Sequence, residues 1–251
     1  NLYNSLTPNA AKKVHVLLHS AFQQAVDLDM LRKNIIHLVK PPKIVQKEPE
    51  IFNKKEIHKL LQTCLKSKRL AKYYPIFLIA TETGMRRGEI LGLRWKDIDL
   101  KKGTIYICQQ LQQLSSSKII FETPKTKAGH RKISITPNII STMATLKSLE
   151  KSIDIKQELL CFRSKNNTPV RPEAIERAWK ELFSLCPDIP YRNFHVLRHT
   201  HATLLLAAGI PIIEVARRLG HSRVSHTLEL YGHAIPNYDD KITKKITQIY
   251  G

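Results

Sequence analysis

Apolar residues recur at helical spacing along most of the chain, and they alternate with period two only near its middle. The first helix is expected over residues 7–28, because Thr7 is a good N-cap and Pro8 suits the first helical position. A second, shorter helix is expected over about 30–38. Two helices bury little by themselves, so this pattern favours the end of a longer helical module. The apolar face of the first helix is formed by Val14, Leu17, Leu18, Ala21, Phe22 and Ala25.

Prolines separate this helical module from the rest of the chain. Pro41, Pro42 and Pro49 break any helix in their neighbourhood. We therefore expect a helical unit over 1–43, a linker over 44–52 and a larger domain over 53–251. The lysines among the prolines leave two interpretations open, a connector that runs along phosphates and an ordinary solvated connector.

The larger domain begins and ends with helices. Asn53 and Glu56 are spaced as in a capping box, and Ile57, Leu60 and Leu61 follow on one face. A buried helix is expected over 73–83, where Gly84 ends it. The other expected helices cover 87–93, 137–151, 172–185, 195–208, 211–219, 223–231 and about 238–249.

Three segments in the middle of this domain have the pattern of strands, namely 104–110, 118–122 and 131–135. The segment from Pro124 to His130 contains a glycine and stands between the last two, where it predicts the tip of a hairpin. The fold class that follows is mainly α with a small antiparallel β-sheet (α+β).

Composition narrows the class of protein further. The chain has 251 residues, of which 42% are hydrophobic, enough for one large domain or for one domain with a smaller module. No apolar run reaches 18 residues and no secretory signal is visible, so we expect a cytoplasmic protein. The four cysteines, Cys64, Cys108, Cys161 and Cys186, are too far apart for a zinc motif and are expected to be reduced.

The charge indicates the partner. Lysine and arginine number 41 and aspartate and glutamate 21, which leaves a net charge of +20. Such an excess favours a polyanion, most commonly nucleic acid. A membrane-surface protein would show a basic amphipathic helix with bulky apolar anchors, and none stands out. Double-stranded DNA is the expected partner.

The residues between His195 and His233 suit phosphoryl transfer. Arg198 lies one helical turn after His195, so both can address one phosphate. Gly220 can end a helix with a left-handed cap, from which His221 projects. Tyr231 is a candidate nucleophile, but its ordinary pKa of about 10 requires a nearby base or a positive pocket. Arg86 lies far upstream, with Glu89 placed to support it.

Four motifs in this order resemble those of the tyrosine recombinase (phage integrase) family. They are G-x-R-x-x-E at 84–89, H-x-L-R-H at 195–199, L-G-H at 219–221 and L-x-x-Y-x-H at 228–233. The sequence is similar in particular to integrases of conjugative transposons and phages of low-GC bacteria. The resemblance covers 50–251 as catalytic domain and 7–45 as the end of a helical, DNA-binding core-binding domain. Earlier core-binding helices and an arm-binding domain have no counterpart, so a fragment is expected.

The resemblance also implies a role for each residue. Tyr231 forms a 3′-phosphotyrosyl bond while Arg86 and Arg198 clamp the phosphate. Lys125, with Lys127 as competitor, is the general acid for the leaving 5′ oxygen. His195 is a general base or proton shuttle, and His221 hydrogen-bonds the phosphate. Glu89 and Gly220 support the set.

Strand exchange by such a site proceeds through a Holliday junction. It implies a homotetramer on DNA, with a monomer or weak oligomer in its absence, and an accessory directionality factor is a further expected partner. No cofactor, metal or ATP is implied, because the covalent bond conserves the energy. Movement of a mobile genetic element by an integrase or excisionase is expected. A transposon cointegrate resolvase or chromosome-dimer resolvase of the same family is the alternative.

Other interpretations are weaker. His195 and His199 have the spacing of a zinc protease, but the glutamate that would activate water is missing and Arg198 would repel a cation. A DNA-binding regulator without catalysis fits the charge and the helices, and differs in having no need of Tyr231. His199 and His233 are expected to support the site or to pack. The tail with Ile242, Ile246 and Ile249 on one face is expected to pack either on its own protomer or on a neighbour.

Overall fold

The structure, a computed structural model, describes residues 5–42, 50–115, 118–149, 159–164, 166–236 and 239–250. The chain divides into two compact units, Asn1–Glu48 and Pro49–Gly251. The expected linker, 44–52, falls largely on residues 43–49, which lie outside the described residues. Its structural role therefore stays a prediction.

Residues 5–42, the described part of the first unit, contain one long helix and a short turn. Helix α2 covers Pro8–Asp27, and the Thr7 side chain accepts a hydrogen bond from the Ala10 backbone as the predicted N-cap. The helix expected over 30–38 is too long, since only a 3-10 turn, η1 (Ile35–Leu38), forms. The buried Asn34 caps this turn, and its amide also donates to the His19 carbonyl of α2 at 3.0 Å.

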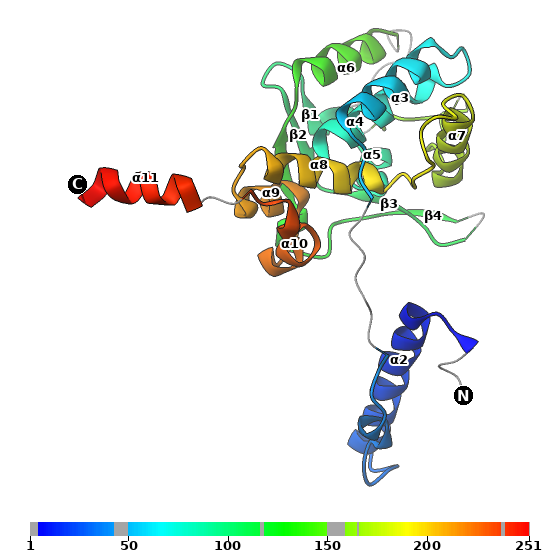
Figure 1. Cartoon of the computed structure of the whole chain (residues 1–251). Helices are drawn as coiled ribbons and strands as arrows, with labels where there is room; N and C mark the ends of the chain where they lie inside the picture. Colours follow the sequence, from blue (N-terminus) through cyan, green and yellow to red (C-terminus); the bar gives the residue numbers. More distant parts are fainter. Residues whose placement is uncertain are drawn as a thin grey trace. The chain divides into compact units, whose positions relative to one another are not determined.

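The second unit is built mainly from helices (Figure 1). The capping box predicted for its first helix is present, because Asn53 and Glu56 each bind the other's backbone N–H. The α-helices are α3 (Lys54–Lys66), α4 (Tyr74–Thr83), α5 (Arg87–Leu91), α6 (Pro137–Leu149), α7 (Pro172–Ser184), α8 (Val196–Ala207), α9 (Ile212–Leu219), α10 (Val224–Tyr231) and α11 (Asp239–Tyr250). Short 3-10 turns are η2 (Ala71–Tyr73), η3 (Trp95–Asp97), η4 (Lys127–Gly129) and η5 (Gly232–Ala234).

In the segments that the structure describes, five short strands form two antiparallel sheets, whereas a single sheet was expected. Strands β1 (Ile98–Asp99), β2 (Thr104–Ile107) and β5 (Arg131–Ser134) make one, in the order β1-β2-β5. Strands β3 (Gln110–Gln113) and β4 (Ile119–Glu122) make the other. The strands on either side of 123–130 therefore do not pair with each other, and the predicted hairpin at this place is wrong.

The close approach of the chain to α5 explains the break in the strand expected over 104–110. Gln109 donates from its side chain to the Gly92 carbonyl at 2.7 Å. A β-carbon on Gly92 would lie 3.0 Å from the backbone nitrogen of Leu111. Strand β3 packs against α5 at this point, so the chain leaves the first sheet after Ile107.

Helix α4 is the centre of the main core. Every residue from Pro75 to Ala80 is buried, and α8 packs along it (Figure 1). Trp179 of α7 packs against Phe77, with ring centroids 5.0 Å apart, and against Phe194 and Phe52. This burial accounts for the apolar run from Pro75 to Ala80 and confirms the buried helix that was expected over 73–83.

A second, smaller core lies between three helices of the second unit. It is formed by α8, α9 and α10, and it includes the ring of Tyr231. Its buried members are Ala202, Leu206, Val215, Leu219 and Tyr231. None of the helices in the described segments has both the length and the apolar character that crossing a membrane requires.

Candidate active site

Arg86 is held at the junction of α4 and α5. Helix α4 ends at Gly84, whose φ of 66° lies in the left-handed region. Arg86 is then the N-cap of α5, and Glu89 in the first turn accepts hydrogen bonds from its backbone N–H at 2.8 Å and its side-chain Nη1 at 3.0 Å. The predicted support of Arg86 by Glu89 is therefore present, and the Arg86 side chain remains 40% exposed.

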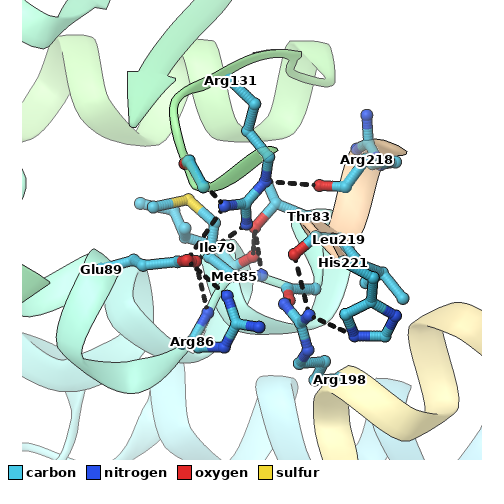
Figure 2. A network of polar contacts seen from close by, with 12 residues as sticks. Ile79, Thr83, Met85, Arg86, Glu89, Arg131, Arg198, Arg218, Leu219 and His221 are labelled. Atoms are coloured by element: carbon cyan, nitrogen blue, oxygen red, sulfur yellow. Dashed lines mark hydrogen bonds and ion pairs between the residues drawn. The ribbon is translucent and has the colours of Figure 1, made fainter. Parts of the chain in front are cut away.

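Glu89 has a second and more buried arginine partner, Arg131 at the start of β5. The two guanidinium Nη atoms of Arg131 each donate to one Glu89 oxygen at 2.9 Å (Figure 2). Burial alone would raise the pKa of Glu89, but the hydrogen bonds and charges of Arg131 and Arg86 outweigh it and hold this pKa below its ordinary value. Glu89 is therefore a carboxylate at neutral pH.

Arg131 was not among the residues expected at the site. It is 7% exposed, and its Nε donates to the Arg218 carbonyl near the end of α9 at 2.7 Å. The sequence contained one signal for it. Arg131, Ile133 and Ile135 alternate on the same face of the strand, and an arginine on a buried face needs a charged partner.

Arg198 of α8 is buried between the ends of α4 and α9. Its guanidinium donates to the Gly84 carbonyl and to the Leu219 carbonyl, each at 2.8 Å, and Nη2 lies 2.9 Å from His221 Nε2 (Figure 2). Burial lowers the pKa of Arg198 to about 9, so the group still carries its charge at neutral pH. Arg198 thereby connects the ends of α4 and α9.

The contact with Arg198 determines the protonation of His221. An arginine only donates hydrogen bonds, so Nε2 of His221 accepts, and its Nδ1–H donates to Thr227 Oγ1 at 2.7 Å. Burial and the charge of Arg198 lower the pKa of His221 to about 3. In this arrangement His221 orients Arg198. The predicted left-handed cap before it is confirmed, since Gly220 has a φ of 72°.

A cleft of about 520 Å³ lies between these groups. Lys125 lines it together with Arg86 and His221, whereas Lys127 is not among its lining residues. Residues of α10, including His226 and Glu229, form another part of the wall. The cleft therefore collects three cationic or hydrogen-bonding side chains that are up to 135 positions apart in sequence, from Arg86 to His221.

Tyr231 and His195 lie differently from the other expected residues. Tyr231 is only 1% exposed and is not among the residues that line the cleft. Its hydroxyl lies 2.7 Å from Nδ1 of His199, a residue expected only to support the site or to pack. His195 is the N-cap of α8 and is solvent-exposed. Although part of the residue is exposed, protein atoms packed around its ring desolvate it, and this, followed by the charges of His199 and Arg198, lowers its pKa to about 4.

The arrangement suits the binding of a phosphodiester. Arg86, Lys125 and Arg198 carry positive charge, and the transition state of phosphoryl transfer gains negative charge that such groups stabilise. In the described part of the chain, no group of three or more histidine, cysteine, aspartate or glutamate side chains is arranged to hold a metal ion.

Comparison with known proteins agrees with this geometry. The sequence model described as the phage integrase family matches residues 50–237. The chain is 28% identical to a tyrosine recombinase XerC-like protein of Caldanaerobacter subterraneus, over 95% of this chain and 66% of that protein. It is 27% identical to the ICEBs1 integrase of Bacillus subtilis, over 97% of this chain and 67% of that protein. It thus spans about two thirds of the length of these curated relatives.

The fold is also that of a solved integrase. The structure of the Tn1549 transposon integrase in complex with a circular intermediate DNA superposes with a TM-score of 0.82. The two sequences are 22% identical, and the match covers 98% of this chain and 81% of the other. The predicted fold class, mainly α with small antiparallel sheets, is confirmed, although the strands are divided between two sheets.

Proposed function

The chain belongs to the phage integrase family, and we propose that it cleaves and rejoins double-stranded DNA as a site-specific tyrosine recombinase. The observation that carries this proposal is the cleft that Arg86, Lys125 and His221 line, with Arg198 held against His221. Arg86, Arg198 and His221 lie within the family motifs quoted above, whereas Lys125 is assigned from the segment between the first two motifs. Tyr231 lies on α10, the helix that forms part of the cleft wall.

The proposed reaction begins with attack of the Tyr231 oxygen on the scissile phosphorus. An O–P bond to tyrosine forms as the bond to the 5′ oxygen breaks, and Lys125 donates a proton to that oxygen. Arg86 and Arg198 stabilise the charge on the non-bridging oxygens. The 5′-hydroxyl of a partner strand then attacks the phosphotyrosine, so the bond energy is conserved between the two steps.

The proposed reaction requires Tyr231 to move. The tyrosine ring is packed into the small core of α8, α9 and α10, whereas the phosphate would lie in the cleft. Helix α10 has only eight residues, and two of them, His226 and Glu229, are exposed at the cleft wall. We infer that DNA binding shifts α10 so that the hydroxyl reaches the phosphorus.

The biological role we propose is movement of a mobile element. This rests on the similarity to the ICEBs1 integrase and to the Tn1549 transposon integrase, both named for mobile elements. The similarity to the XerC-like protein supports the second candidate, resolution of joined DNA molecules. Recombination between two sites on separate plasmids, compared with two sites on one plasmid, distinguishes integration from resolution.

The proposed assembly on DNA is a homotetramer, to which the first unit adds DNA contacts as part of a core-binding domain. Side chains of α11 support a role for the tail in this assembly, because Ile246 is 50% and Ile249 65% exposed. Deletion of residues 238–251 is expected to weaken tetramer formation on DNA. Unchanged assembly would instead assign the tail to its own protomer.

A covalent trapping experiment tests the central proposal. The protein is incubated with a nicked DNA site from which the cleaved strand diffuses away, and denaturing electrophoresis detects a protein–DNA adduct. Wild type is expected to form the adduct and Tyr231→Phe is expected to form none. A wild-type protein that binds the site without any adduct would favour a non-catalytic regulator, and an undiminished adduct with Tyr231→Phe would remove Tyr231 as nucleophile.

A further inference from the structure

The hydroxyl of Tyr231 has a histidine in direct contact, and this histidine is His199. The Oη–Nδ1 distance is 2.7 Å, and the two ring centroids lie 5.6 Å apart at an interplanar angle of 52°. Among the described residues, His199 is the hydrogen-bond partner of this hydroxyl. The contact joins α8 to α10, so it brings together residues that are 32 positions apart.

The direction of this hydrogen bond follows from the two protonation states. Burial raises the pKa of Tyr231, although the charges of Arg198 and Arg86 act in the opposite direction, so the hydroxyl keeps its proton at neutral pH. Burial and the charge of Arg198 lower the pKa of His199, so its ring is neutral. The hydroxyl therefore donates to Nδ1, and the ring proton of His199 is on Nε2.

The other two histidines of the site are placed differently. His221 uses Nε2 to accept from Arg198 and Nδ1–H to donate to Thr227. His195 lies at the exposed start of α8, with its ring centroid 4.9 Å from that of His199 in an edge-to-face arrangement. Among the described contacts, neither ring is hydrogen-bonded to Tyr231.

We propose that His199 is the proton acceptor for Tyr231 in the cleavage step, an inference that rests on the proposed recombinase function. The shift of α10 proposed above must keep the Tyr231 hydroxyl in contact with His199 of α8. The Tyr231 proton then moves from Oη to Nδ1 of His199 as the Oη–P bond forms and the P–O5′ bond breaks. Lys125 gives a proton to the 5′ oxygen. In the rejoining step the 5′-hydroxyl proton returns to Lys125, and His199 returns its proton to the departing tyrosine oxygen.

The charges around His199 connect this proton transfer to DNA binding. The titratable and charged groups that face its ring are Arg198 and His195 of its own segment and Tyr231 of α10. Without DNA, the charge of Arg198 disfavours an imidazolium next to it. A phosphate bound to Arg198 brings negative charge that offsets this repulsion. His199 therefore becomes a better proton acceptor once the scissile phosphate is in place.

A His199→Asn variant separates proton acceptance from hydrogen bonding. The asparagine amide oxygen can occupy the position of Nδ1 and accept the same hydrogen bond, but it is not basic. The single-turnover rate of adduct formation on the nicked substrate is expected to fall by about 10²–10⁴-fold at saturating DNA. His199→Ala, which lacks the acceptor, is expected to fall at least as far. His58→Asn, at an exposed position of α3, is the matched control and is expected to react like wild type.

A substrate with sulfur at the bridging 5′ position distinguishes a missing base from a missing acid. Its thiolate leaves without protonation, so Lys125→Ala is expected to regain cleavage on it while His199→Asn remains slow. Melting temperature and DNA affinity close to those of wild type are required of each variant, which keeps a folding defect apart from a chemical one. His199→Asn is the variant that changes the structure least.

Three outcomes would overturn the role of His199 while leaving the recombinase intact. The first is a wild-type rate in both His199 variants. The second is a faster rate, which would identify the contact as one that holds the tyrosine in its resting position. The third is rescue of His199→Asn by the sulfur substrate. Absence of any adduct with wild type would instead remove the proposed function itself.

Discussion

Arg131 and Glu89 form a buried ion pair with two parallel hydrogen bonds of 2.9 Å each. Their side chains are 5% and 3% exposed, so neither charge is solvated by bulk water. Through Glu89 the pair reaches Arg86, and through Nε of Arg131 it reaches the Arg218 carbonyl next to the L-G-H motif. The pair therefore connects the G-x-R-x-x-E motif with the L-G-H motif, which lie far apart in the sequence.

Loss of Arg131 is expected to destabilise the protein strongly. Arg131→Met leaves Glu89 as a buried carboxylate without its main partner, and breaking a buried pair in this way lowers the free energy of unfolding by about 3–5 kcal/mol. Urea unfolding followed by circular dichroism measures the change. Lys59→Ala, which breaks the exposed pair with Asp188, is the control and is expected to leave the midpoint unchanged. Equal losses in the two variants would contradict the special role of the buried pair.

The contribution of Glu89 is expected to depend on pH. Its pKa is lower in the folded protein than the ordinary value of 4.5, so its stabilisation is complete above about pH 4.5 and is lost as the pH falls through the lower, folded value. Glu89→Gln is therefore expected to be less stable than wild type at pH 7, and the difference is expected to shrink below pH 4.5. Melting temperatures of both proteins between pH 3 and 7 measure it, and a gap that is constant over this range would contradict the assignment.

Arg86 is expected to act on cleavage and not on folding, because its side chain is partly exposed. Arg86→Ala removes a donor to the transition-state oxygens, which lowers the single-turnover rate by about 10²–10³-fold. DNA affinity is expected to change little. The neighbouring Arg87→Ala, which removes an ion pair with Glu176, is the matched control and is expected to keep the cleavage rate at saturating DNA. A parallel loss of binding in Arg86→Ala would indicate a structural role.

Lys125 and Lys127 are expected to differ in effect. Lys125 lines the cleft and Lys127 does not, although both side chains are exposed and they are two residues apart. Lys125→Ala is expected to slow cleavage of ordinary DNA by about 10²–10⁴-fold, as for loss of a general acid, and to recover with a better 5′ leaving group. Lys127→Ala is expected to cleave normally. The reverse pattern would move the acid to Lys127.

Gly220 is expected to tolerate no side chain. A β-carbon there would lie 2.7 Å from Nη1 of Arg131 and 3.0 Å from the Ala128 carbonyl, in addition to the strain of a positive φ. Gly220→Ala is expected to lower both stability and cleavage. Gly103→Ala is the control, because it shares the positive φ, but its tight contact at 3.1 Å is with the flexible end of Ile140, and the Ile135 carbonyl lies at an ordinary 3.7 Å. The free energy of unfolding of Gly103→Ala is expected to be about 1 kcal/mol lower than that of wild type, and its cleavage rate is expected to stay unchanged. Similar cleavage by both variants would separate Gly220 from the site.

Local features of this protein were predictable from its sequence. The capping box of Asn53 and Glu56, the N-cap at Thr7 and the left-handed glycines at 84 and 220 depend on residues within a few positions of each other. The motifs around Arg86 and Arg198 were also sufficient to identify the family. In each case the residues that cause the feature lie within about one helix turn of each other, so their spacing in the sequence is enough to predict it.

Contacts between distant segments required the tertiary structure. The pairing of β2 with β5 past β3 and β4 depends on how β3 packs on α5, which no periodicity records. The partner of Arg131, the contact of His221 with Arg198 and the contact of His199 with Tyr231 span 42, 23 and 32 residues. The motifs were enough to propose Arg86, Arg198, His221 and Tyr231 for the site, but they did not indicate Arg131. The packing of α8, α9 and α10 decided which atom each histidine nitrogen contacts. Burial and neighbouring charge then decided which nitrogen of each ring carries the proton.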